Sequence, residues 1–274
     1  MYGERQGPHV ELGQSRLEPG HVPAQLGPED LGLVGRKAVV RAALRASRRR
    51  RVEAMTAPEH ESAAQKLALN VLKMLGRLQT ATPTCPGTVA LYLAYGSEPP
   101  TNRLVALCLA QGWRVLLPVL LEDRDLDWVQ ARDADHPLTH SARAAEVMES
   151  VSRAGGRLGR AAIAQADAVV VPALAVDAAG TRLGQGGGSY DRALARLPHR
   201  RPIAALLWEG EFIPDDLLPF GARDRPVTMV VSPSGIVEVI PVSVEGRFPS
   251  PPFPAKSVGR TVTPIGPLPD TNLR

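Results

Sequence analysis

Apolar residues in the middle of the chain form short runs that are separated by amphipathic stretches. Runs at 89–94, 114–119 and 168–175 predict buried strands, and the last, AVVVPALA, is the best candidate for the centre of a sheet. Between the first two runs, residues 101–111 have helical spacing and Gly112 ends them. This strand, helix, strand order predicts a parallel pair of strands.

Two amphipathic helices are predicted ahead of the first strand. The first begins at Gly35, and its cations Lys37, Arg41 and Arg45 recur every four residues along one face. The second spans Pro58–Gly76 and has a continuous apolar side. Further short strands are predicted near Trp128 and at 203–208, 228–231 and 236–240. The whole pattern predicts a single three-layer α/β domain with a mostly parallel, Rossmann-like central sheet.

Both ends of the chain differ in composition from this core. Residues 1–33 mix Gly, Pro, His and charged residues without periodicity, and residues 245–274 are rich in proline. We expect disordered extensions there and a folded domain at 34–244. The N-terminus has no apolar run typical of a secretory signal, and no stretch has the length of a membrane span. The sequence therefore predicts a cytoplasmic protein without a membrane partner.

The formal net charge is +4, and its densest cluster is the tetra-arginine Arg48–Arg51. Such a run could contact nucleic-acid phosphates. Because no aromatic residues are interleaved with it and acidic residues are abundant elsewhere, we favour a solvated helix face at Arg45–Arg51 and expect no nucleic-acid partner. Cys85 and Cys108 have the spacing of neither a zinc site nor a redox pair.

A glycine-rich segment, RLGQGGGSYDR at Arg182–Arg192, follows the most apolar strand and precedes a predicted helix. Glycines let backbone N–H groups approach phosphate oxygens, and a helix N-terminus adds partial positive charge. The spacing matches neither a Walker loop nor the dinucleotide fingerprint. From the glycines alone, a tight turn and a phosphate-binding loop are nearly equal alternatives.

The residues around this loop favour the second alternative. VPALAVDAAGTRLGQGGGSYDRAL resembles the signature of the 5-formyltetrahydrofolate cyclo-ligase family, in which an apolar strand ending in PxLxxD precedes Gx(R)LGxGxGxYDR. Lys37, Arg41 and Arg45 resemble the cationic helix of the family, and Ser97, Glu98 and Thr101 resemble its SxExxT element. LLPV at 116–119 resembles the following strand. The resemblance covers roughly residues 36–239.

The resemblance implies a three-layer fold of the sugar-phosphate isomerase and CoA-transferase style, and an ATP-dependent enzyme of one-carbon metabolism. Such an enzyme converts 5-formyltetrahydrofolate to 5,10-methenyltetrahydrofolate and releases ADP and phosphate. It implies catalytic roles for Arg182 and Tyr190, folate contacts from Glu98, Gly186, Gly188 and Tyr190, and a Mg²⁺ ligand in Asp191. The implied ATP-binding residues are Lys37, Arg41, Arg182, Leu183, Gly184, Gln185, Gly186, Gly187, Gly188, Ser189 and Tyr190. For Tyr190, packing beneath the loop is an equal alternative.

The chain departs from the family pattern in two places. Ser150 follows Glu149 where the family has Pro, and Thr228 stands where a second Asp is frequent. A neutral hydroxyl is a poorer Mg²⁺ ligand than a carboxylate, so the residues indicate the phosphate half of the site more strongly than the magnesium half.

Two other functions remain open. One is an enzyme of related fold, such as a sugar-phosphate isomerase, that uses the same loop for a different anion. The other is a non-catalytic protein that binds folate or a nucleotide. In the favoured interpretation the partner is a small molecule, 5-formyltetrahydrofolate, which can carry a polyglutamate tail. The protein is expected to be a monomer.

Overall fold

The computed structural model describes residues 32–79, 86–131, 156–214, 218–221 and 224–239. The predicted extensions at 1–33 and 245–274 lie outside these residues, apart from Gly32 and Leu33. Glu149 and Ser150 also lie outside them. In the described ranges, no helix is long and apolar enough to cross a membrane.

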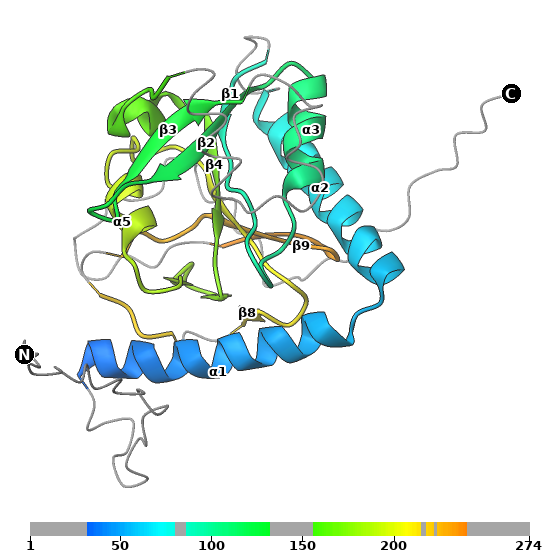
Figure 1. Cartoon of the computed structure of the whole chain (residues 1–274), viewed down its shortest axis with the longest axis vertical. Helices are drawn as coiled ribbons and strands as arrows, with labels where there is room; N and C mark the ends of the chain where they lie inside the picture. The colour runs from blue at the N-terminus through cyan, green and yellow to red at the C-terminus, as the bar shows by residue number, and fades with distance from the viewer. Residues whose placement is uncertain (1–31, 80–85, 132–155, 215–217, 222–223, 240–274) are drawn as a thin grey trace, which may run out of the picture.

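A central sheet runs through the middle of the domain (Figure 1). Its strands are β1 (Thr88–Ala90), β2 (Arg114–Leu120), β3 (Leu126–Gln130), β4 (Ala168–Pro172), β7 (Ile203–Leu206), β9 (Met229–Ser232) and β10 (Gly235–Glu238). Their order is β10-β9-β7-β4-β1-β2-β3. The five inner strands are parallel to one another, and β3 and β10 pair antiparallel at the two edges. The predicted α/β fold with a mostly parallel sheet is confirmed.

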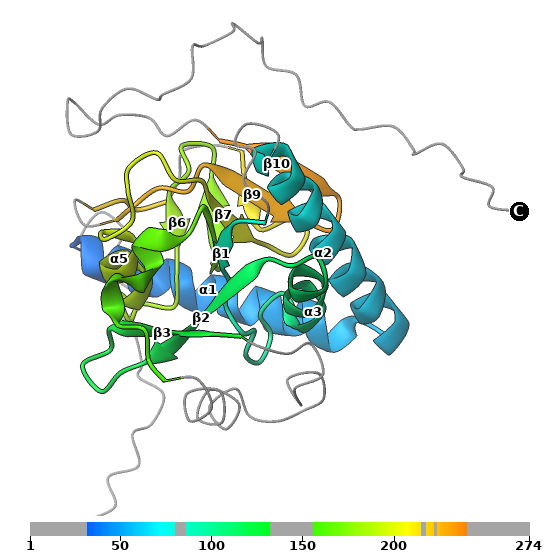
Figure 2. The same ribbon diagram turned by 90° about the horizontal axis from the view of Figure 1, so that it is seen from above.

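Helices cover both faces of this sheet (Figures 1 and 2). On one face, α2 (Ala57–Gln79) and α3 (Asn102–Ala110) bury Leu67, Val71 and Leu104 against the strands. On the other face, η3 (Arg160–Gln165) and α5 (Ser189–Leu194) bury Ile163 and Leu194. The sheet and the helices on its two faces form the predicted three layers, and the two apolar clusters lie between these layers. In this arrangement the branched aliphatic side chains of the strands are removed from water.

A second, smaller sheet lies between the central sheet and the long helix α1 (Leu33–Ala54). Its strands are β5 (Ala175–Asp177), β6 (Arg182–Leu183) and β8 (Phe212–Ile213), in the order β6-β5-β8. Val40 and Leu44 of α1 pack against the cluster of Ala175, Leu183 and Leu218. As a result, α1 extends across one end of the domain (Figure 1).

The apolar run at 168–175 was predicted to be one strand, and this is wrong in part. The chain leaves the central sheet after Pro172, and Leu174 then donates a backbone hydrogen bond to Leu183 in the smaller sheet, at 2.7 Å. Hydrophobicity alone does not distinguish one long strand from two short strands in different sheets. The first predicted strand, 89–94, is likewise shorter, since β1 ends at Ala90.

The tetra-arginine does not form a uniformly solvated face. Arg48 is 1% exposed and binds Glu211 with two hydrogen bonds, Nε to Oε1 at 2.8 Å and Nη2 to Oε2 at 2.6 Å. Arg48 also donates to the carbonyl of Ala173, at the end of β4. Arg49 and Arg50 are exposed, as predicted. The prediction failed for Arg48 because a buried carboxylate distant in the sequence compensates its charge.

Candidate active site

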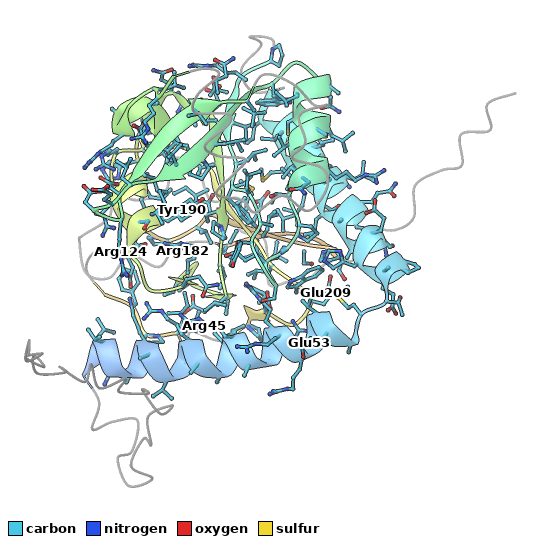
Figure 3. The ribbon with its side chains drawn as sticks, viewed as in Figure 1. Arg45, Glu53, Arg124, Arg182, Tyr190 and Glu209 are labelled. Carbon is cyan, nitrogen blue, oxygen red and sulfur yellow. The ribbon has the colours of Figure 1, made fainter. Side chains whose placement is uncertain are left out.

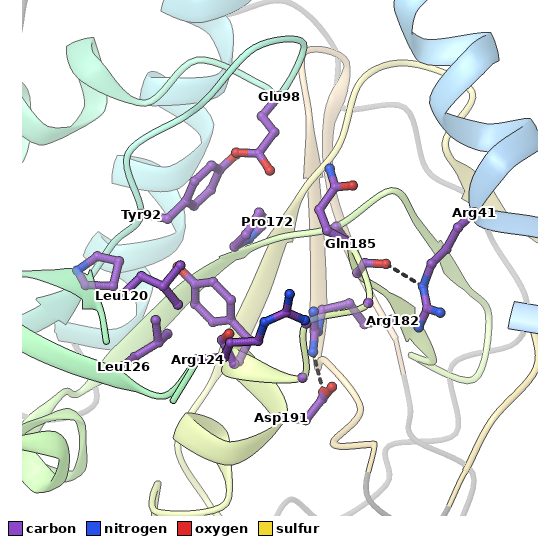
Figure 4. A pocket seen from close by; sticks show the side chains of 18 of the residues that line it. Arg41, Tyr92, Glu98, Leu120, Arg124, Leu126, Pro172, Arg182, Gln185 and Asp191 are labelled. Atoms are coloured by element: carbon purple, nitrogen blue, oxygen red, sulfur yellow. Dashed lines mark hydrogen bonds and ion pairs between the residues drawn. The ribbon is translucent and has the colours of Figure 1, made fainter. Parts of the chain in front are cut away.

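A cavity of about 680 Å³ lies at the carboxyl ends of the parallel strands (Figure 4). Tyr92 and Leu93 follow β1, and Pro172 and Ala173 end β4. In the central sheet, β2 lies on one side of β1 and β4 lies on the other side, so the order of the strands reverses at β1. Open α/β sheets bind ligands in the crevice at the carboxyl ends of the strands where such a reversal occurs.

The glycine-rich loop forms one wall of this pocket. Gly186 and Gly188 have φ angles of +103° and +68°, which side chains rarely adopt. A Cβ atom at Gly186 would also lie 3.4 Å from the guanidinium of Arg41. The loop therefore requires glycine at both positions for its backbone conformation, and at Gly186 a side chain would in addition come into contact with Arg41 of α1.

Cations of α1 hold the carbonyl groups of the loop. Arg41 Nε donates to the carbonyl of Gly184 at 2.9 Å. Arg45 donates from Nε to Gln185 Oε1 at 2.8 Å and from Nη2 to the Gln185 carbonyl at 2.6 Å. Figure 3 shows Arg45 pointing from α1 toward the part of the domain that carries Arg182. Burial, followed by repulsion from Arg45, lowers the pKa of Arg41. This concentration of positive charge favours an anionic ligand.

Arg182 lies at the centre of the site, on β6 and not within the loop itself. Its guanidinium pairs with Asp191 in the first turn of α5 (Figure 4). The Arg182 Nε atom is buried without a hydrogen-bond partner among the described residues. A buried donor without a partner is costly, and the pairing with Asp191 is the contact that holds this guanidinium in place.

A second ion pair, Lys37 with Asp224, lines the same pocket. The backbone N–H of Gly221 donates to Asp224 at 2.7 Å. The described residues contain no cluster of three or more His, Cys, Asp or Glu that could hold a metal ion. Magnesium, however, usually takes only one or two carboxylates and completes its shell with phosphate oxygens and water. Asp191 and Asp224 fit that requirement.

Thr228 does not line the pocket. Its hydroxyl accepts a hydrogen bond from the N–H of Ile203 and donates one to the Ile203 carbonyl, each at 3.1 Å, so it joins the starts of β7 and β9. This side chain is therefore used within the sheet and does not point into the pocket as a metal ligand would. The carboxylate available to the pocket from this part of the chain is Asp224.

The other side of the pocket is mostly apolar and contains one acid, Glu98. Its Oε2 atom accepts a hydrogen bond from the N–H of Tyr95 at 3.1 Å, and burial raises the pKa of Glu98. Tyr190 packs against both large core clusters while it lines the pocket, and burial raises the pKa of its hydroxyl. Leu93, Pro118, Leu120 and Leu126 complete this apolar side.

Almost all of the predicted site residues line this one pocket. They are Lys37, Arg41, Glu98, Arg182, Gly184, Gln185, Gly186, Gly187, Gly188, Ser189, Tyr190 and Asp191. Leu183 does not; its side chain packs beneath the loop in the smaller apolar cluster. The Tyr190 ring lies both in the pocket wall and in the core, so neither of its two predicted roles excludes the other.

Several lining residues were not predicted, among them Tyr92, Pro172, Arg124 and Asp224. Tyr92 lies just beyond β1 and Pro172 ends β4, but both fall within the longer strands predicted at 89–94 and 168–175, so the rule that ligands bind at carboxyl ends would have pointed beyond them. Arg124 lies in a loop without a motif, so no comparable signal in the sequence marks it. Asp224 opens the segment 224–231, which resembles the family element that contains Thr228, so the sequence carried a signal for this acid.

Comparison with known proteins identifies the family of this chain. The model of the 5-formyltetrahydrofolate cyclo-ligase family matches residues 34–233. The 5-formyltetrahydrofolate cyclo-ligase of Mycolicibacterium smegmatis is 35% identical over 207 residues, which cover 73% of this chain and 96% of the relative.

Two solved structures have a similar fold. The 5,10-methenyltetrahydrofolate synthetase of Aquifex aeolicus aligns with a TM-score of 0.54 and 22% identity, over 74% of this chain and 92% of that one. The synthetase of Mycoplasma pneumoniae aligns with a TM-score of 0.51 and 19% identity, over 70% and 98%. At these identities the structures support the fold, and the matches in sequence support the family. The chain belongs to the 5-formyltetrahydrofolate cyclo-ligase family.

Proposed function

We propose that this protein converts 5-formyltetrahydrofolate to 5,10-methenyltetrahydrofolate, using ATP and releasing ADP and phosphate. One observation carries the proposal: a cationic wall suited to phosphates and an apolar wall with one acid face the same pocket. Such a pocket can hold a nucleoside triphosphate and a pterin side by side. Membership of the family supports this choice of substrates.

The triphosphate would lie along the glycine-rich loop and α1. Lys37, Arg41 and Arg182 would neutralise its charge, and the backbone N–H groups at Gly184–Ser189 would donate to its oxygens. Phosphoryl transfer depends on positioning and charge neutralisation more than on a covalent nucleophile. Asp191 and Asp224 would hold Mg²⁺, which when bound adds positive charge next to the phosphate oxygens.

The folate would lie against the opposite wall. The Glu98 carboxyl group would accept hydrogen bonds from N–H groups of the pterin, and Tyr190 would offer its ring face or its neutral hydroxyl to the formyl group. A neutral tyrosine hydroxyl can donate a hydrogen bond, and the raised pKa of Tyr190 keeps that proton in place.

The reaction would proceed in two steps. The formyl oxygen attacks the γ-phosphorus, the bond to the bridging oxygen breaks, and ADP leaves. N10 then attacks the formyl carbon and loses its proton, while the C–O bond breaks and phosphate leaves with the electron pair. A methenyl bridge between N5 and N10 remains. Arg182 lines the pocket, and its guanidinium is suited to the charge on the transferring phosphoryl group.

The direct test is an absorbance assay for the methenyl product, run on the purified full chain with and without ATP and Mg²⁺. We expect product only when 5-formyltetrahydrofolate and ATP are both present. Turnover of another anionic substrate without ATP would favour the isomerase-like alternative. Binding of both ligands without release of phosphate would identify a non-catalytic homologue.

A further inference from the structure

The turn between β2 and β3 contains a strained arginine. In the part of the chain that the structure describes, Arg124 is the non-glycine residue with positive φ, at +64°. This left-handed conformation costs free energy for any residue with a side chain, and glycine or asparagine is usual there. A strained residue that is not glycine suggests that its side chain has a function.

The backbone of Arg124 is held firmly in this conformation. Arg192 of α5 donates from Nη2 to the carbonyl of Arg124 at 2.6 Å and to the carbonyl of Gly187 at 3.2 Å, so it connects the turn to the glycine-rich loop. The next residue, Asp125, is buried and accepts hydrogen bonds from Arg196 at 2.5 Å and Arg160 at 3.2 Å. The direction in which the Arg124 side chain leaves the turn is therefore constrained.

The side chain of Arg124 lines the pocket, and Figure 4 shows it extending from the turn toward Arg182. Lys37 and Arg182 are paired with Asp224 and Asp191. By contrast, the guanidinium of Arg124 makes no hydrogen bond or ion pair with any residue that the structure describes. An arginine held at the rim of a pocket without an acidic partner is suited to bind an anion of the ligand.

The surroundings of Arg124 indicate which anion this is. Leu120, the last residue of β2, is 65% exposed, and Pro118 and Leu126 also line this part of the pocket. Phosphate groups have no apolar surface for these side chains; the adenine of ATP does, and the KM for ATP of an Arg124 variant separates that alternative. A ligand that fits has an apolar segment followed by a carboxylate, which is the chemistry of a benzoyl ring joined to glutamate.

We propose that Arg124 binds the glutamate carboxylates of the folate substrate, with the benzoyl ring packed against Leu120. Arg124 would thus determine specificity for the tail of the substrate, whereas Glu98 contacts its pterin. Figure 4 shows Glu98 and Arg124 on different sides of the pocket, as one elongated ligand requires. This inference rests on the proposed function.

The test compares 5-formyltetrahydrofolate with 5-formyltetrahydropteroate, which lacks the glutamate. We expect Arg124→Ala to raise the KM for the glutamate form roughly 10-fold, as expected for loss of one charge-assisted contact. The KM for the pteroate and the KM for ATP should not change. Arg124→Lys should recover part of the loss. Arg103→Ala, which removes an exposed arginine of α3 from outside the pocket, is the matched control.

Arg124→Gly guards against misfolding, because glycine adopts the positive φ without strain; it should fold at least as stably and show the same tail-specific defect. An equal rise in KM for 5-formyltetrahydrofolate and for the pteroate, or a rise in the KM for ATP alone, would overturn the proposal.

Equilibrium binding of the two folates, measured without ATP, separates this proposal from the proposed function. If the native chain forms no methenyl product but Arg124→Ala loses only tail-dependent binding, then the proposed function fails and Arg124 keeps its role. Equal binding of the glutamate form by variant and native chain would instead refute that role.

Discussion

The Arg182 side chain is held in the centre of the pocket by two neighbours. Asp191 pairs with its guanidinium, and Gly184 has no side chain where a Cβ atom would approach Arg182 Nη1 to 2.7 Å. The guanidinium is thereby fixed before a ligand binds. Fixed donors stabilise a charged transition state more than mobile ones, because little reorganisation is needed during the reaction.

We expect Arg182→Ala to lower the turnover number by on the order of 100-fold, since it removes donors to the transferring phosphoryl group. Arg182→Lys keeps the positive charge but not the planar set of donors, so its turnover number should lie between that of the native chain and that of Arg182→Ala. Both are measured as methenyl formation at saturating ATP, with circular dichroism to confirm folding. Nearly normal turnover of the alanine variant would remove Arg182 from the mechanism.

The raised pKa of Glu98 has a consequence for stability. Because burial raises this pKa in the folded protein, the folded state binds a proton more tightly than the unfolded chain, and stability falls as the pH rises from the ordinary pKa of Glu through the raised value. We expect Glu98→Gln to be more stable than the native chain above this window and to lose that advantage in acid. Urea unfolding at several pH values measures the difference. Glu53→Gln, at an exposed position of α1, is the control, and a difference that does not depend on pH would contradict the prediction.

At the scale of elements, the position of α1 determines whether the cationic wall exists. Lys37 and Arg41 reach the pocket from this helix, and Arg45 binds the loop. The helix is anchored further along by Arg48, which joins it to Glu211 and to the end of β4. The Glu211 carboxylate also accepts a hydrogen bond from the backbone of Trp208 at 2.9 Å. Structural anchoring and ligand binding therefore depend on the same face of one helix.

Removing the Arg48 side chain should destabilise the position of α1, and with it the cationic wall of the pocket. We expect Arg48→Ala to lower the free energy of unfolding by about 3 kcal/mol, because it leaves the buried carboxylate of Glu211 without its main partner. The KM for ATP should rise more than the turnover number falls. Combining it with Glu211→Gln should recover much of the stability. Arg49→Ala, at the exposed neighbouring position, should change stability by less than about 0.5 kcal/mol. Equal effects of the two alanine variants in urea unfolding would show that Arg48 does not anchor the helix.

At the scale of the whole molecule, the described lining of the pocket comes from segments that lie far apart in the chain: α1, the region from the end of β1 to β3, the segment from β4 to α5, and Asp224. The last described residue is Val239, and the match to the family ends at residue 233. All of the described residues that line the pocket therefore precede the proline-rich end of the chain.

Deletion of residues 246–274 should leave methenyl formation unchanged, because that segment follows both the match to the family and the lining of the pocket. The measurement is turnover of the purified truncated chain beside that of the full chain. A truncated protein that folds, as judged by its thermal transition, but does not form product would contradict this expectation.

The sequence by itself determined the helices, most strands, the fold class and the glycine-rich loop. Each of these depends on local spacing or on a continuous motif, as in the helix predicted at 101–111 and the loop before Tyr190. Only the tertiary structure decided that Arg48 is buried, that Thr228 serves the sheet, and that Arg124 lines the pocket. The physical reason is that burial and pairing depend on partners distant along the chain, such as Glu211 for Arg48, and no local pattern records them.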